Sequence, residues 1–276
     1  PRCRLPLPLP PLGQRGTTKT MLKILNSQAK SITGAALIIS GATLVSRLVG
    51  LLRDRIFAHY FGAGPVMDAY YAAFKIPDLV YNLLIIGALS AAFIPTFTKL
   101  FYGSEAQPRT EPALAGSGTG DKSPAWKLAN NVLNITAVSL GVVSVMGIIF
   151  TPALAPLIAP GFSPASQELV ISFTRIMFGS TILLGLSMVI GGILQSLRAF
   201  FLYSLAPIFY NVGIIIGATI LAPIWGINGL AWGVVLGAFF HFSLQTYSAY
   251  ANGYRWRWYL NWRDKEAKLM GKLMIP

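Results

Sequence analysis

The residue best placed to do chemistry is an arginine inside the first long apolar segment of the chain. Arg47 is the single charged residue of residues 32–52. Insertion scales assign about 2.5–3.5 kcal/mol to an arginine at the centre of a membrane-spanning helix, so such a residue usually faces a cavity or a partner. Arg47 also precedes Leu52 by five residues, about 7.5 Å of helix, and its side chain could instead reach the lipid headgroups. Both interpretations stay open at this point.

Small and polar neighbours accompany Arg47 on the same segment. Arg47, Gly50 and Asp54 recur at helical spacing and share one face, and Ser46 adds a hydroxyl next to Arg47. If the helix is regular, Arg53 points about 120° away from Arg47. Arg53 is therefore either a second wall of a wide cavity or an anchor at the membrane interface.

Three charged residues share one face of the second apolar segment. Asp68, Lys75 and Asp78 stand at helical spacings of seven and three residues, which place them on one side of a helix. One interpretation is a polar wall opposite Arg47, where a break at Pro77 frees backbone groups that must face protein or water. The other is a structural ion pair at a helix end. We favour the ion pair for Lys75 and Asp78 and a functional role for Asp68.

The other polar residues do not form an enzyme signature. With 2 histidines the chain has no HExxH motif, and it has no acidic cluster of the kind that holds magnesium. The single cysteine, Cys3, excludes an internal disulfide and a cysteine-cluster metal site. We therefore expect no catalytic residue, no metal and no cofactor. Arg175 is equally a surface anchor or a ligand contact, and Gln195 and Asn211 are candidates for hydrogen bonds between helices.

Membrane helices must position these residues. The chain is 54% hydrophobic and 11% charged, with a mean hydropathy of +0.60, outside the range of an ordinary soluble domain. Its apolar runs of roughly 20 residues match the length that crosses a bilayer. We expect an all-α, polytopic membrane helix bundle of about six transmembrane helices, at residues 32–52, 68–97, 132–150, 171–197, 203–223 and 229–250. Small-xxx-small rows predict close helix packing at Gly213 with Gly217, and at Gly229, Gly233 and Gly237.

The distribution of basic residues predicts the topology. The net charge is +13, but the basic residues lie between and beside the apolar runs and do not form a stripe for nucleic acid. Of the 22 Lys and Arg residues, 17 fall on one side of the expected spans, 2 on the other and 3 within them. Because cytoplasmic loops are enriched in Lys and Arg, we expect an even number of spans with both chain ends cytoplasmic.

Composition divides the chain into a short leader and one membrane lobe. Residues 1–20 are Pro-rich and basic, and we treat them as a disordered or non-native segment. Residues 21–276 form the transmembrane lobe. Within it, residues 103–123 have the composition of a flexible cytoplasmic loop, and the Pro-rich residues 151–166 suggest a structured cap at the interface. Residues 272–276 look like the start of a further hydrophobic segment, so we expect a fragment.

Several spaced motifs resemble one known family. The motifs are SRLVGLLRD at 46–54, FGAG at 61–64, DAYYAAFKIP at 68–77, GALSAAFIP at 87–95, APGF at 159–162 and GILQSL at 192–197. In this order they resemble the MurJ/MviN family of bacterial lipid II flippases, which belongs to the MOP exporter superfamily. The likeness extends over nearly all of residues 21–276.

The resemblance implies a bundle of about fourteen helices in two pseudo-symmetric halves, of which this chain resembles the first. Such a flippase lies in the bacterial inner membrane with a cytoplasmic N-terminus. It carries lipid II, the undecaprenyl-diphosphate-linked peptidoglycan precursor, outward by alternating access through a cationic cavity. Its partners would be lipid II, membrane lipids and cell-wall synthesis proteins, with no nucleic acid.

The same resemblance implies roles for individual residues. Arg47, Arg53 and Asp68 match substrate-binding positions, and a planar guanidinium suits a dianionic diphosphate. Gate or supporting positions are matched by Ser46, Gly50, Asp54 and Lys75. The chain departs from the family at Tyr81-Asn82, where many members have basic residues.

Two alternatives remain. A related MOP-type exporter could carry another polyprenyl-linked polysaccharide or a drug cation, since a fold does not determine a substrate. A cation carrier should show acidic rather than basic residues inside the membrane. The chain could also be a non-transporting scaffold or pseudo-flippase, and the nucleotide sequence past Pro276 would distinguish that case.

Overall fold

The computed structural model describes residues 32–82, 92–103 and 123–264. Within these ranges the chain is helical, with short turns, one extended segment and no strand. The expected all-α class is therefore confirmed. The expectations for residues 1–20, for nearly all of the loop at 103–123 and for residues 272–276 lie outside the described ranges.

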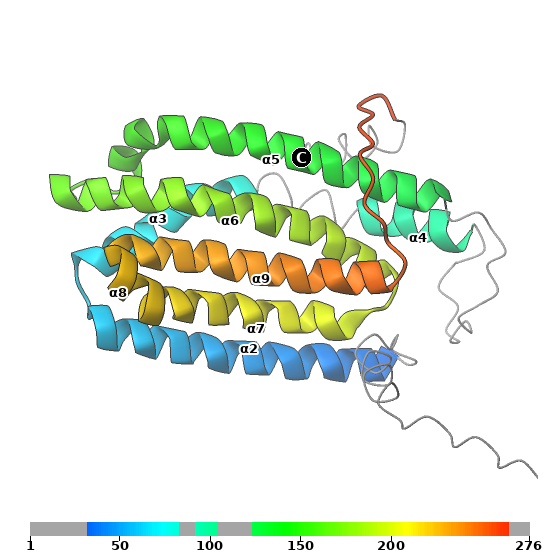
Figure 1. The fold of residues 1–276 in the computed structure, drawn as a ribbon, viewed down its shortest axis with the longest axis horizontal. Helices are drawn as coiled ribbons and strands as arrows, with labels where there is room; N and C mark the ends of the chain where they lie inside the picture. Colours follow the sequence, from blue (N-terminus) through cyan, green and yellow to red (C-terminus); the bar gives the residue numbers. More distant parts are fainter. Residues whose placement is uncertain (1–31, 83–91, 104–122, 265–276) are drawn as a thin grey trace, which may run out of the picture.

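The long helices lie side by side in the order α5, α6, α9, α7, α2 (Figure 1), and α3 packs against α6. The elements are α2 (Ile32–Phe61), α3 (Pro65–Tyr81), α4 (Ile94–Tyr102), α5 (Ser123–Ile158), α6 (Pro164–Ser196), α7 (Phe200–Ile216), the π-helical turn η3 (Gly217–Leu221), α8 (Ala222–Trp225), η4 (Gly226–Asn228) and α9 (Gly229–Ala251). Two buried apolar clusters form the core. One surrounds α4 and the start of α5, and the other lies where α3, α6 and α9 meet.

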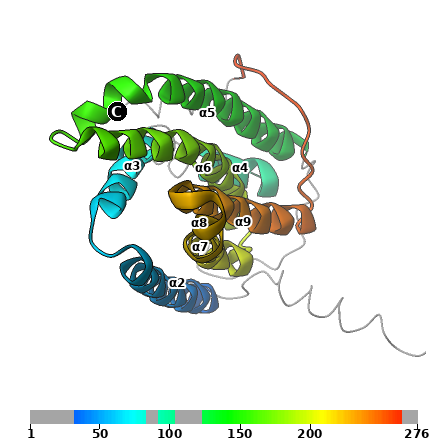
Figure 2. The same cartoon turned by 60° about the vertical axis from the view of Figure 1, so that its left-hand side comes forward.

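Four helical stretches of the described chain are long and apolar enough to cross a membrane: Ala36–Phe61, Ser123–Ile158, Pro164–Ser196 and Phe200–Ala251. The last is 52 residues long and reverses direction after α8, where Gly226 has a φ of 67°. α7 and α9 therefore lie antiparallel beside one another (Figures 1 and 2). Five of the six expected spans correspond to α2, α5, α6, α7 and α9. The expected span at 68–97 corresponds to two helices, α3 and α4, on either side of residues 83–91.

Two expected boundaries are wrong. The first span does not end at Leu52, because α2 continues through its charged residues to Phe61, and contacts of Arg53 with α7 stabilise that part of the helix. The third span does not end at Phe150, because α5 passes through Pro152 and Pro156 and ends at Ile158, so the first half of the cap expected at 151–166 is helical.

The described basic residues follow the expected one-sided pattern. Lys99 lies in the last turn of α4, Lys127 in the first turns of α5 and Arg198 directly after α6. All three positions are at the end of the bundle where α2 begins and α9 finishes (Figure 1). This end of the bundle, which also carries the arginines that follow α9, is called the basic end below.

Glycines hold α7 and α9 in close contact, as the small-residue rows predict. A Cβ atom added to Gly213 would lie 2.3 Å from the Cα of Gly237, and one added to Gly217 would lie 2.4 Å from the Cα of Gly233. Both distances are to backbone, which cannot move aside as a side chain can. The packing interpretation is therefore confirmed, and it agrees with the use of small residues between membrane helices.

A hydroxyl of α6 donates a hydrogen bond to the backbone carbonyl that Pro77 leaves unpaired in α3. Proline has no N–H, so the Ala73 carbonyl four residues earlier loses its helical partner. The Thr174 hydroxyl donates to this oxygen at 3.3 Å, and both residues are fully buried. The expectation that groups freed by Pro77 face protein or water is confirmed. α3 nevertheless continues past Pro77 to Tyr81.

Arg175, the next residue of α6, performs the same task for α5. Pro152 leaves the Ile148 carbonyl without its i+4 donor, and Arg175 Nε donates to that oxygen at 3.3 Å. This contact gives Arg175 a structural role that its position in the sequence does not indicate.

A first prediction concerns the glycine contacts. Gly233→Ala should lower the free energy of unfolding by about 1–3 kcal/mol, because the added methyl group overlaps the backbone of η3. The matched control is Gly141→Ala in α5, since a Cβ at Gly141 has nothing within 4 Å, and alanine favours a helix over glycine by about 1 kcal/mol. Unfolding of the purified chain in micelles, followed by circular dichroism, measures both. Equal stability of the two variants would contradict the close contact.

A second prediction separates the role of Arg175 from a surface anchor. Arg175→Met should destabilise the chain by about 1–3 kcal/mol by leaving the Ile148 carbonyl unpaired. In a Pro152→Ala background the restored backbone N–H can bond Ile148, so the same substitution should cost much less. The same unfolding assay on the four proteins gives the coupling energy. An anchor at the membrane surface would show none.

Candidate functional site

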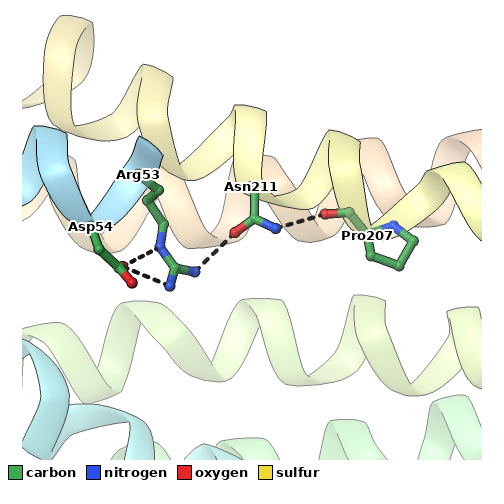
Figure 3. Close-up of polar contacts among 4 residues, drawn as sticks. All are labelled: Arg53, Asp54, Pro207 and Asn211. Carbon is green, nitrogen blue, oxygen red and sulfur yellow. Dashed lines mark hydrogen bonds and ion pairs between the residues drawn. The ribbon is translucent and has the colours of Figure 1, made fainter. Parts of the chain in front are cut away.

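Arg53 is the centre of the polar contacts between α2 and α7 (Figure 3). Its Nε and Nη2 atoms donate to Asp54 Oδ1 at 3.0 and 2.8 Å, and its Nη1 atom donates to Asn211 Oδ1 at 2.9 Å. No other ion pair occurs among the described residues. A guanidinium has five N–H donors. Three are used here, so two remain for a ligand.

Asn211 anchors Arg53 to α7. The Asn211 amide is buried, and its Nδ2 atom donates to the Pro207 carbonyl of the same helix at 3.0 Å. This bond orients the amide so that its oxygen faces Arg53 (Figure 3). Gly50 faces the same oxygen, since a Cβ added there would lie 4.0 Å from it. The predicted hydrogen bond between helices is therefore confirmed for Asn211.

The similar prediction for Gln195 is also confirmed. Its Nε2 atom, near the end of α6, donates to the Tyr203 hydroxyl of α7 at 3.2 Å. This bond lies at the basic end of the bundle, away from Arg53.

Arg47 lies in the middle of α2 rather than near its end. Because α2 extends to Phe61, about 21 Å of helix separates Arg47 from that terminus, whereas five residues separate it from Leu52, where the apolar run ends. The Arg47 side chain is exposed and makes no hydrogen bond or ion pair with the described residues. Arg47 and Arg53 therefore stand about 9 Å apart along the axis of α2. One is held by its neighbours and the other is free.

One tyrosine of α3 and one of α7 lie within electrostatic range of Arg53. Tyr70 is 2% exposed and Tyr210 is partly buried, and the charge of Arg53 reaches both hydroxyls. Tyr210 also experiences the charge of the Asp78 carboxylate. α2 meets α3 where the Phe57 ring packs edge-on against Tyr70 at 5.3 Å, and it meets α7 where Arg53 bonds Asn211. Tyr70 and Tyr210 were not among the predicted site residues, because no feature of the sequence separates them from the other tyrosines of the chain.

Asp68 and Lys75 line an open pocket of about 400 Å³ at the opposite end from the basic end. They share one exposed face of α3, as predicted from their spacing. The other wall is the turn between α5 and α6, which contributes Ala159, Pro160 and Phe162. None of the described residues lining this pocket comes from α2. The structure therefore does not bring Asp68 to Arg47.

The ion pair predicted for Lys75 and Asp78 is not formed among the described residues. Lys75 faces the pocket, whereas Asp78 lies near Tyr210 and Tyr81. Three residues advance a helix by about 300°, which is about 60° short of a full turn. The two side chains of α3 therefore point to different neighbours.

Ser46 lies partly buried beside Arg47 on α2.

Comparison with known proteins identifies the family. The family model described as "Lipid II flippase MurJ" matches residues 57–276. The lipid II flippase MurJ of Burkholderia cenocepacia is 33% identical over 215 residues, which cover 76% of this chain and 39% of that protein. The probable lipid II flippase MurJ of Bdellovibrio bacteriovorus is 32% identical over 258 residues, which cover 91% and 46%. The chain thus spans less than half the length of these relatives.

Solved structures agree in fold. A structure of lipid II flippase MurJ in an inward closed conformation matches with a TM-score of 0.66 at 23% identity, over 87% of this chain and 47% of that one. A MOP superfamily transporter from Pyrococcus furiosus matches with a TM-score of 0.61 at 16% identity, over 92% and 52%. These identities support the fold alone. Because the family model covers the chain from the end of α2 to the last described residue and beyond, the chain belongs to the lipid II flippase MurJ family.

Proposed function

We propose that this chain forms the part of a lipid II flippase that binds the diphosphate of the precursor during its passage from the cytoplasmic to the outer leaflet. The observation that carries the proposal is Arg53, which is fixed between α2 and α7 with two N–H donors unused. Charge-assisted bonds from a guanidinium to phosphate oxygens are among the strongest hydrogen bonds in proteins. The names of the relatives supply the substrate.

Arg47 and Arg53 divide the task between them. Arg53 is oriented before the ligand arrives, so little conformational freedom is lost on binding. Arg47 has no competing partner among the described residues and is free to follow the diphosphate as the bundle changes shape. Asp54 lowers the cost of keeping Arg53 ionised when the site is empty. Gly50 and Ser46 support this arrangement by keeping the α2 surface small beside both arginines.

Asp68 and Lys75 would contact a different part of the substrate. Their pocket is open and carries one charge of each sign, which suits the sugar and peptide headgroup with its hydroxyl, amide and carboxylate groups. Asp68 would accept hydrogen bonds from the headgroup, and Lys75 would donate to it. Because this pocket lies at the end opposite the basic end, the two residues would act where the headgroup leaves the bundle.

The distribution of basic residues supports one orientation in the membrane, and the names of the relatives support a bacterial membrane. The basic end of the bundle would face the cytoplasm, with the N-terminus on that side, and the membrane would be the bacterial inner membrane. Proteins that make or use lipid II would be the natural partners.

The polarity of α2 favours this function over export of a drug cation. The MOP superfamily transporter of Pyrococcus furiosus has a binding pocket of reverse polarity, which suggests a different function for that protein, so this fold accommodates more than one substrate. In the present chain the ionised groups in the middle and second half of α2 are mainly arginines. A cationic drug would be repelled there.

Complementation of a cell depleted of its own lipid II flippase tests the proposal. In the complete gene, Arg47→Ala and Arg53→Ala should each abolish growth. They should also weaken binding of purified lipid II about 10- to 100-fold, because bonds to a charged group are lost. Arg53→Lys should be intermediate, since an ammonium lacks the planar fork. The control Arg55→Ala removes an exposed arginine of α2 and should support growth. Growth of the Arg47→Ala and Arg53→Ala strains at normal protein levels would refute the proposal.

A further inference from the structure

An extended segment follows α9 and crosses to α5. Residues 254–261 have no regular secondary structure, and Figures 1 and 2 show the segment in orange and red, running from the end of α9 to the first half of α5. Residues 252–264 are called the strap here. The function proposed above makes no use of it.

Asparagine side chains of α5 make the hydrogen bonds to the strap backbone that a neighbouring strand would make in a sheet. Asn131 Nδ2 donates to the Asn261 carbonyl at 3.0 Å, and its oxygen accepts from the Asn261 N–H at 2.7 Å. Asn130 donates to the Arg255 carbonyl at 3.2 Å and accepts from the Arg257 N–H at 2.8 Å. A primary amide has the same donor and acceptor as a peptide group. The Asn130 and Asn131 side chains therefore provide hydrogen bonds to backbone N–H and C=O groups of the strap that are not paired with a strand.

Asn134 completes the set one turn further along α5. Its Nδ2 atom donates to the carbonyls of Arg257 and Tyr259 at 3.1 and 3.0 Å, and its oxygen accepts from Trp256 Nε1 at 3.1 Å. The three asparagines are at most 3% exposed. Buried amides with this many bonds impose one conformation on the strap.

Tyr254 anchors the start of the strap in the core. It is 1% exposed, its ring lies 5.9 Å from that of Trp126, and its hydroxyl donates to Asn130 Oδ1 at 3.0 Å. Burial raises the pKa of the Tyr254 hydroxyl well above its ordinary value, so it remains a donor at any physiological pH. The strap is thus a built element with a defined outer surface.

The outer surface of the strap combines tryptophans with arginines. Its exposed tryptophans are Trp256, Trp258 and Trp262, with exposed fractions of 50%, 64% and 54%. Arg257 and Arg263 are exposed, and their guanidiniums make no hydrogen bond or ion pair within the described part of the chain. Arg255 differs, because its Nη1 atom donates to the Tyr250 and Tyr254 carbonyls at 2.7 Å.

The surroundings of the strap add positive charge. The strap begins at the basic end of the bundle, which also carries Lys99, Lys127 and Arg198. Of the acidic residues that the structure describes, Asp264 alone lies on the strap. Tryptophan concentrates where a membrane meets water, and basic residues at that level bind acidic lipid headgroups.

We propose that the strap is a binding site for acidic phospholipid headgroups. Arg257 and Arg263 would donate to the phosphates, and the three exposed tryptophans would lie among the glycerol and upper acyl groups. The asparagines fix the backbone of the strap, so headgroups bind to exposed side chains without first ordering a flexible tail. The inference depends on the proposed function only for its orientation, which places the site in the cytoplasmic leaflet.

Native mass spectrometry of the purified chain tests this site, with titrations of phosphatidylglycerol and phosphatidylcholine. We expect phosphatidylglycerol to bind more tightly. One basic residue at a membrane surface contributes about 1 kcal/mol, so Arg257→Gln should raise the dissociation constant for phosphatidylglycerol about fivefold, and adding Arg263→Gln should raise it about fivefold again. The control Arg55→Gln removes an exposed arginine near the opposite end of α2 and should leave binding unchanged.

Three results would overturn the proposal. They are equal binding of the two lipids, an equal loss for Arg55→Gln and Arg257→Gln, and displacement of phosphatidylglycerol by inorganic diphosphate at equal concentration. The last would reassign the strap to free phosphates. Circular dichroism should show unchanged folding of the variants, because the substituted guanidiniums make no hydrogen bond or ion pair with other described residues. Loss of complementation in the Arg53 variants would not affect these binding constants, so the two proposals fail independently.

Discussion

Inside a bilayer a backbone carbonyl that has lost its helical partner finds no water to replace it. Prolines create such carbonyls in α3 and α5, and α6 supplies donors to both, from Thr174 and from Arg175. Consecutive residues on a helix diverge by about 100°, so a single helix can serve neighbours on two sides. This requirement contributes to the place of α6 between α3 and α5. The pocket lined by Asp68 and Lys75 lies between α3 and the turn that joins α5 to α6.

The same constraint explains why three arginines inside apolar helices differ in what they can do. Arg175 is committed to a backbone oxygen and contributes to packing. Arg53 is only partly committed, since Asp54 and Asn211 orient it and leave donors unused. Arg47 has no partner among the described residues. A charge in the membrane is therefore a sign of function only after the demands of the backbone around it have been met.

Helix ends and crossings show two further solutions to the same problem. Between α7 and α9, glycines let the backbones approach so closely that no side chain fits. At the basic end of the bundle, three buried asparagines provide an extended strap with the hydrogen bonds that a sheet would otherwise supply. On the strap, Trp258, Trp262, Arg257 and Arg263 stay exposed.

Composition and periodicity determined the class of the protein, most of its membrane helices, the glycine contacts and the asymmetric distribution of charge. These properties depend on residues close together in the sequence, on the length of an apolar run or on the spacing along one helix. They also drew attention to Arg47, Arg53 and Asp68 by charge and helical spacing, while the roles of these residues came from the family resemblance. The shared face of Arg47, Gly50 and Asp54 on α2 could be recognised in the sequence because these residues lie within about two helical turns of one another.

The tertiary structure alone decided what those residues contact. It extended α2 past its charges to Phe61, carried α5 through Pro152, and gave Arg175 a carbonyl partner on another helix. It also brought Tyr70 and Tyr210 to Arg53, and turned Asp68 toward the α5–α6 turn instead of Arg47. All of these contacts have the same physical reason. Each depends on a contact between segments far apart in the chain, and a side chain's own type does not specify which distant partner will satisfy it.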